Sequence, residues 1–189
     1  MSLLRRIATD LGARKLRPAQ LVVVIGAPGI GKTRYALSIA ASLTLTSRPL
    51  PVLFFAPGTD KRALLRRLIA AWRPARLPLP TARAQRLRTA PLYFNNAPRL
   101  WPLEIWSHAR QLDSRLRRQG ERLGLILVDD LHRIGGRSYA HKVSDFKILA
   151  REMGLLIIVL ARPHPSLAAA LRRERVASTT LPARETPHD

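Results

Sequence analysis

The sequence contains no cysteine and no long apolar run. The lack of cysteine excludes disulfide bridges and cysteine-ligated metal sites, and it favours a cytoplasmic protein. The longest apolar stretches, at 21–25 and 155–161, are far shorter than the roughly 20 residues of a membrane-spanning helix. The first residues also lack the apolar core of a signal peptide. We therefore expect a protein without a membrane segment.

Acidic residues are scarce as well: 12 Asp and Glu stand against 33 Lys and Arg, which gives a net charge of +21. Such an excess of positive charge repels itself in a folded protein, so it predicts a polyanionic partner. Nucleic acid is the first candidate and an anionic membrane surface the second, while a base-composition bias towards arginine is the plainer alternative. The side chains that we expect to contact DNA are Arg83, Arg86, Arg88, Arg137, Arg172 and Arg173.

Aromatic residues make up only 5% of the chain, and Tyr139 is the nearest one to Arg137 in the expected loop at 135–137. Nonspecific binding of single strands usually combines basic grooves with aromatic side chains on which bases stack. Stacking is therefore little supported, and phosphate contacts are the expected mode of binding. The five histidines show no metal-ligand spacing.

What the chain does contain is a regular alternation of apolar runs and amphipathic stretches. Runs without period-two alternation are typical of strands buried on both faces, and strands that alternate with helices predict a parallel sheet. We therefore predict an α/β domain with a core of about five strands flanked by helices. The expected strands cover 21–25, 51–55, 92–94, 125–128 and 155–160, and the clearest helices cover 33–43, 61–72, 101–119 and 166–175.

The organisation along the chain follows from the same patterns. Residues 1–18 are expected to form a basic N-terminal helix, and 19–175 the α/β domain. Within that domain, 73–90 contains three prolines and five arginines but no acid, which is typical of a loop. Residues 176–189 are predicted to be a polar tail.

A glycine-rich motif, G-x-x-x-x-G-K-[ST], stands between the first strand and the first helix. This position is the one that a phosphate-binding loop requires, because glycines let backbone N–H groups and a helix N-terminus point at phosphate oxygens. The lysine is expected to reach the β- and γ-phosphates of ATP, and the threonine hydroxyl to bind Mg²⁺. The expected nucleotide-binding residues are Gly26, Ala27, Pro28, Gly29, Ile30, Gly31, Lys32, Thr33 and Arg34.

Two acids follow the fourth apolar run. Asp129 lies at the carboxyl end of a predicted buried strand, where sites of parallel sheets collect, so we expect it to hold Mg²⁺ through water, opposite Thr33. A turn residue facing solvent is the alternative. For Asp130 we weigh two roles equally: polarising an attacking water molecule, or facing solvent.

The ordered series of these motifs resembles the C-terminal ATPase domain of DnaB-type replicative helicases, a branch of the RecA-like P-loop NTPases. The similarity covers most of 21–167, including the phosphate loop, 92–96 with the helix after it, and 125–134. The resemblance implies ATP and Mg²⁺ as ligands, single-stranded DNA as a partner, and a homo-oligomer or a larger protein complex.

The chain also departs from that family. Gly58 stands at the position of the family's catalytic glutamate, and Arg162 at that of the glutamine that senses the γ-phosphate. We expect the chain to end before the later strands that carry a basic finger. Asp130 could replace the water-orienting carboxylate, and Arg162 the finger. We therefore predict catalytic roles for Lys32, Asp129, Asp130 and Arg162, with weak or partner-dependent hydrolysis.

Two other functions fit the same residues. A non-hydrolysing, nucleotide-dependent adaptor that binds DNA and recruits a partner is favoured by Gly58 and the missing finger. A small-molecule kinase shares the phosphate loop, but the chain shows no obvious lid segment. The leading interpretation is an ATP-binding protein that acts on DNA in replication, recombination or a mobile element.

Overall fold

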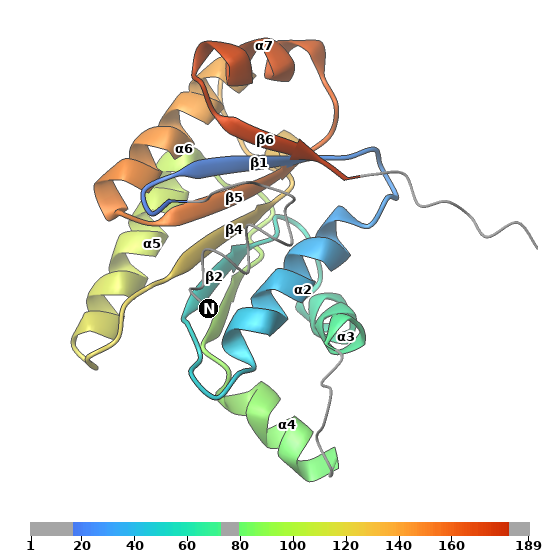
Figure 1. The fold of residues 1–189 in the computed structure, drawn as a ribbon, viewed down its shortest axis with the longest axis vertical. Helices are drawn as coiled ribbons and strands as arrows, with labels where there is room; N and C mark the ends of the chain where they lie inside the picture. The colour runs from blue at the N-terminus through green and yellow to red at the C-terminus, as the bar shows by residue number, and fades with distance from the viewer. Residues whose placement is uncertain (1–16, 73–79, 182–189) are drawn as a thin grey trace, which may run out of the picture.

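The computed structural model describes residues 17–72 and 80–181 (Figure 1). The helix expected over 1–18 thus lies almost entirely outside the described residues. Along the chain the elements are β1 (Leu21–Ile25), α2 (Lys32–Thr44), β2 (Val52–Phe55), α3 (Lys61–Ala71), α4 (Pro80–Thr89), β3 (Leu92–Asn95), α5 (Pro102–Arg117), β4 (Leu125–Asp129), the short 3₁₀ helix η1 (Leu131–Arg133), α6 (Tyr139–Met153), β5 (Leu156–Ala161), α7 (Pro165–Arg173) and β6 (Ala177–Thr180).

The six strands form one parallel sheet in the order β3-β2-β4-β5-β1-β6. The predicted α/β class with a parallel sheet is confirmed. The apolar runs became the central strands, because a strand covered on both faces needs apolar side chains on both. All five residues of β4 and all six of β5 are buried.

Helices cover both faces of the sheet. Side chains of α2 and α3 pack on one face together with Val22 and Val24 of β1, whereas α5, α6 and α7 pack on the other face with Leu21 and Val23. Figure 1 shows the same division, with α2, α3 and α4 on one side of the strands and α5 and α6 on the other. In the part of the chain that the structure describes, no helix is long and apolar enough to cross a bilayer.

Two segments differ from the sequence prediction. Part of the expected loop at 73–90 forms helix α4, whose Leu87 packs against the core. The expected polar tail begins with strand β6, which pairs with β1 and adds a sixth strand to the expected five. Every other residue of β6 is exposed, so its sequence, Ala-Ser-Thr-Thr, lacks the apolar run that marks the central strands.

The carboxyl ends of the parallel strands meet at one edge of the sheet. β1 leads into the glycine-rich loop there, β2 into Pro57 and Gly58, β4 into Asp130, and β5 into Arg162. Since β5 lies between β1 and β4, the glycine-rich loop and the two acids come from strands separated by a single strand. The topology thus collects residues from four distant parts of the sequence at a single place.

Candidate nucleotide-binding site

The glycine-rich loop joins β1 to α2 in a tight turn. The Gly26 N–H donates to Ala161 O at 3.0 Å, which fixes the start of the loop to the end of β5. Gly29 and Gly31 have φ angles of 82° and 97°, in the left-handed region that favours glycine. A Cβ on Gly26 would lie 2.9 Å from the Ile30 side chain, so any other residue there would have to displace Ile30. These positions explain the glycine spacing of the motif.

Helix α2 presents its N-terminus to the same space. Gly31 is its N-cap, no side chain caps it, and its first turn contains no acid. The free N–H groups and the positive end of the helix dipole therefore face the loop, which is the arrangement that binds phosphate.

Lys32 is 8% exposed, and its Nζ donates to Gly26 O at 2.7 Å and to Ala27 O at 2.8 Å. Burial lowers the pKa of Lys32, while Asp130 and Asp129 act in the opposite direction. The ammonium group is thus held over the loop by two carbonyls, at the place where the motif requires a cation.

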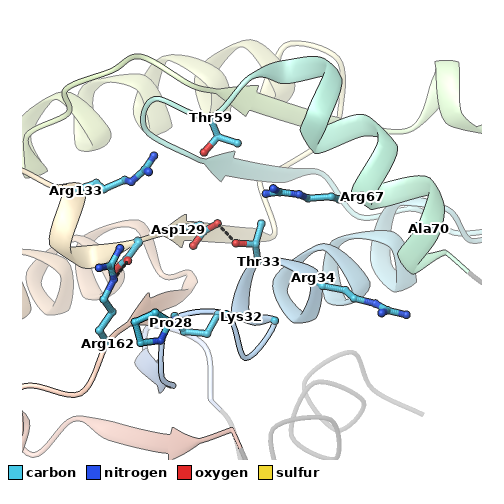
Figure 2. A pocket seen from close by; sticks show the side chains of 13 residues that line it. Pro28, Lys32, Thr33, Arg34, Thr59, Arg67, Ala70, Asp129, Arg133 and Arg162 are labelled. Carbon is cyan, nitrogen blue, oxygen red and sulfur yellow. Dashed lines mark hydrogen bonds and ion pairs between the residues drawn. The ribbon is translucent and has the colours of Figure 1, made fainter. Parts of the chain in front are cut away.

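Thr33 and Asp129 meet across the site, where the Thr33 hydroxyl donates to Asp129 Oδ2 at 2.6 Å (Figure 2). Burial raises the pKa of Asp129, although the Thr33 hydrogen bond, Lys32 and Arg133 lower it. A hydroxyl and a carboxylate are hard oxygen ligands that suit Mg²⁺. The described residues hold no cluster of three or more His, Cys, Asp or Glu side chains, so an ion bound here would take its other ligands from phosphate and water.

Asp130 is 8% exposed and lies in an ion pair instead of facing solvent. Arg162 Nε donates to Asp130 Oδ2 at 3.0 Å, and His132 Nδ1 lies 3.0 Å from Asp130 Oδ1. Asp130 Oδ1 also accepts from the His132 backbone N–H and so caps η1. Both carboxylate oxygens of Asp130 therefore have partners.

These side chains line a cavity of about 690 Å³. Residues from the loop, α2, α3, β4, η1 and the end of β5 surround it, as Figure 2 shows. Its cations outnumber its acids, which makes the cavity suited to a polyphosphate. The lining residues are Pro28, Gly29, Gly31, Lys32, Thr33, Arg34, Thr59, Arg67, Ala70, Asp129, Asp130, Arg133 and Arg162.

The loop after β2 contributes no acid to this cavity. Gly58 has a φ of 65°, and a Cβ there would lie 3.5 Å from Arg133 Nη1. The same Nη1 donates to Pro57 O at 2.6 Å. A guanidinium from η1 therefore occupies the space beside Gly58.

The arginines that we expected to contact DNA lie in three separate places. Arg86 and Arg88 are exposed on α4, which leads into the edge strand β3, whereas Arg172 and Arg173 are exposed on α7, which leads into the opposite edge strand β6. Figure 1 shows α4 and α7 at opposite ends of the molecule. Arg83 also lies on α4. The fold thus does not gather the expected contacts into one groove.

Arg137 lies on a third surface, in the turn between η1 and α6, and is exposed. This turn is tied to the start of α5, because the Gly135 N–H donates to Leu100 O at 2.8 Å. The indole of Trp101, 54% exposed, rests on Gly135, where a Cβ would lie 2.6 Å from the ring. The turn is therefore backed by an aromatic side chain.

Comparison with known proteins agrees with this geometry. The family model described as "DnaB-like helicase C terminal domain" matches residues 9–167. The chain belongs to this family. The predicted resemblance is therefore confirmed. The matched residues include the glycine-rich loop and five of the six strands.

Curated relatives give the same family. The chain is 31% identical to the replicative DNA helicase DnaB of Nostoc sp. over 179 residues, covering 85% of this chain and 20% of that protein. It is 28% identical to the DnaB of Leifsonia xyli, covering 78% of this chain and 35% of that protein. The chain thus spans about a fifth to about a third of these relatives.

Solved structures show the same fold. A DnaB-like replicative helicase, solved in a study of its interactions with primase, is similar with a TM-score of 0.61 and 19% identity, over 81% of this chain and 41% of that one. A second solved structure, described as an ATPase domain, has a TM-score of 0.64 and 17% identity, over 88% of this chain and 64% of that one. At these identities the likeness shows the fold alone, and this fold agrees with the family of the matching model.

The structure brings most of the predicted site residues together, but it also adds some. Pro28, Gly29, Gly31 and Arg34 line the cavity with Lys32 and Thr33, whereas Gly26 and Ala27 contribute carbonyls to Lys32 and Ile30 packs at Gly26. Sequence reasoning missed the cavity roles of Thr59, Arg67, Ala70 and Arg133. Thr59 and Arg133 follow β2 and β4 closely, so their position at strand ends was the available signal.

Proposed function

We propose that this chain binds ATP together with Mg²⁺ in the cavity at the carboxyl edge of the sheet. The observation that carries the proposal is the hydrogen bond of Thr33 to Asp129 at 2.6 Å, beside the buried Lys32. Backbone N–H groups of the loop and the N-terminus of α2 would bind the phosphates, and Lys32 would bind the β- and γ-phosphates. Thr33 and Asp129 would hold Mg²⁺, which neutralises charge on the phosphate oxygens when it is bound.

Hydrolysis by this site is proposed to be slow or dependent on a partner. Gly58 offers no carboxylate beside the phosphates, and a positioned general base is worth roughly 10²–10⁴ in rate. Asp130 and Arg162, the residues expected to replace the base and the finger, are paired with each other at 3.0 Å. For Asp130 to act as a base, this ion pair has to open, which adds to the barrier, whereas Arg162 is bound to Asp130 through Nε alone.

We propose that the nucleotide-bound protein acts on single-stranded DNA, in replication, recombination or a mobile element, within a homo-oligomer or a larger complex in the cytoplasm. The membership in the DnaB-like family and the net charge of +21 support this. A non-hydrolysing adaptor that recruits a partner protein is the second candidate, favoured by the arginine beside Gly58.

Replacing Lys32 with Ala tests the binding site. We expect the Kd for Mg·ATP, measured by calorimetry, to rise about 10- to 100-fold, because one charge-assisted contact to each of two phosphates is lost. Arg48→Ala is a matched control, since this exposed cation follows α2 and is not among the cavity residues. An unchanged Kd in Lys32→Ala would remove the basis of the proposed site.

Phosphate release then separates the two candidate functions. We expect the isolated protein to release phosphate slowly, and single-stranded DNA to accelerate it if the chain is an ATPase that acts on DNA. No release under either condition, with Mg·ATP bound, would favour the adaptor. Rapid release by the isolated protein would contradict the proposed slow hydrolysis.

A further inference from the structure

Arg133 is a cation in the nucleotide cavity with no acidic partner in the described part of the chain. Its one hydrogen bond there is the 2.6 Å donation from Nη1 to Pro57 O, although a guanidinium carries five N–H donors. Arg162, by comparison, is paired with Asp130. Other N–H groups of Arg133 thus stay available on the wall of a cavity that it lines together with Thr33 and Asp129.

Arg133 is exposed, and one hydrogen bond orients its guanidinium. The bond to Pro57 O ties it to the turn after β2, where the Thr59 N–H donates to Ala56 O at 3.1 Å. Gly58 lies directly beside it, since an added Cβ would be 3.5 Å from Nη1, an ordinary contact distance. An arginine that is fixed before its ligand arrives loses less side-chain entropy on binding than one that moves freely.

The shape of the cavity determines which part of a bound ligand would lie near Arg133. The loop and α2, with Lys32, form one wall, while Thr59, Arg67 and Arg133 form the wall across Thr33 and Asp129 (Figure 2). Arg133 acts electrostatically on Asp129, whose pKa it lowers. An anionic group beside the Thr33–Asp129 pair and away from the loop would therefore meet Arg133.

Resting on the proposed nucleotide binding, we infer that Arg133 binds the terminal phosphate of a nucleoside triphosphate and makes the site discriminate triphosphate from diphosphate. A diphosphate held by the loop does not extend to the far wall, so it leaves Arg133 without an anion. A guanidinium also has no basic lone pair and accepts no proton. The space beside Gly58 thus serves to read the third phosphate and not to activate water.

Arg133→Met tests this inference with hydrolysis-resistant ATP and with ADP, both in Mg²⁺, by calorimetry on the full chain. We expect the Kd for the triphosphate analogue to rise about tenfold, the effect of one charge-assisted hydrogen bond, and the Kd for ADP to change less than about twofold. Arg133→Lys, which keeps a charge, is expected to recover part of the discrimination. Arg48→Met, at an exposed arginine outside the cavity, is the matched control.

The outcomes separate this inference from the proposed function. Equal losses for both nucleotides would mean that Arg133 only anchors the turn at Pro57, and no loss for either would mean that it does not touch phosphate; each result overturns the inference while nucleotide binding stands. A wild-type chain that bound neither nucleotide would overturn both. Thermal unfolding without nucleotide shows that the variant is folded before the ratio is interpreted.

Discussion

Asp129 is subject to two opposing demands. In its proposed role as a metal ligand it has to be ionised, yet burial raises its pKa by disfavouring the charged carboxylate. An acid whose pKa is raised by folding opposes folding when it is ionised, so its cost to stability is present above its folded pKa and is relieved as the pH falls through that value. The residue thus lowers the stability of the nucleotide-free protein in favour of binding.

Asp129→Asn is therefore expected to keep or raise the melting temperature of the nucleotide-free protein near neutral pH, and this advantage should shrink as the pH falls. The same variant should weaken the Mg²⁺-dependent part of ATP affinity about tenfold or more. Thermal scans at several pH values, with and without Mg·ATP, measure both effects. A large loss of stability without nucleotide would show that the carboxylate is needed for the fold itself.

The roles of site residues were predictable where a short segment of the sequence specifies them. The glycine spacing, Lys32, Thr33 and Asp129 follow from the motif and from the end of an apolar run. The place of Arg133 after a strand was a signal, but its contact with Pro57 was not predictable, because it joins residues 76 positions apart. The pairing of Asp130 with Arg162 spans 32 positions and was also out of reach. The sequence suggested a role for each of these two residues, but not that they would form an ion pair with each other.

At the scale of elements, apolar runs predicted the buried strands, while β6 and α4 were missed for a common reason. Neither element has a wide apolar face: alternate residues of β6 are exposed, and Leu87 is the main core contact of α4. The conformation of β6 is stabilised by β1, a neighbour distant in sequence. Contacts between segments distant in sequence cannot be read from the hydrophobic pattern of one segment.

Strand β6 gives a prediction with an internal control. The Leu181 N–H donates to Ile25 O, so by the period of two the Thr179 N–H points at β1 and the Ser178 N–H points away. Thr179→Pro is expected to lower the free energy of unfolding by about 1–3 kcal/mol through the lost ladder bond. Ser178→Pro should cost clearly less, because proline is tolerated where an edge N–H faces outward. Urea titrations compare the two, and equal losses would mean that β6 is not paired as described.

For the whole molecule, the excess of basic residues, 33 against 12 acidic ones, should dominate the proposed binding to DNA. The logarithm of affinity for an oligonucleotide is expected to fall linearly with the logarithm of salt concentration, with a slope of about −0.7 for each phosphate contacted on a single strand. Affinity that barely changes with salt would contradict the electrostatic origin of binding.

The two edges of the sheet are not equivalent in this respect. Helix α4 carries no acid, whereas on α7 Arg173 lies 3.6 Å from Glu174. Arg86→Gln with Arg88→Gln is therefore expected to reduce the salt slope by about 1.4, and Arg172→Gln with Arg173→Gln by less. Fluorescence anisotropy at several salt concentrations measures both double variants. The reverse order would place the strand along α7 instead.

The contact of Trp101 with Gly135 makes the fluorescence of Trp101 sensitive to the turn beside the proposed nucleotide-binding site. The indole is more exposed than those of Trp72 and Trp106, and it rests on the turn that follows η1, the helix that carries Arg133. A displacement of that turn would change the solvent exposure of the indole and thus the wavelength of its fluorescence emission. The chain thus carries a built-in reporter of whether events at the phosphates are transmitted to the surface around Arg137.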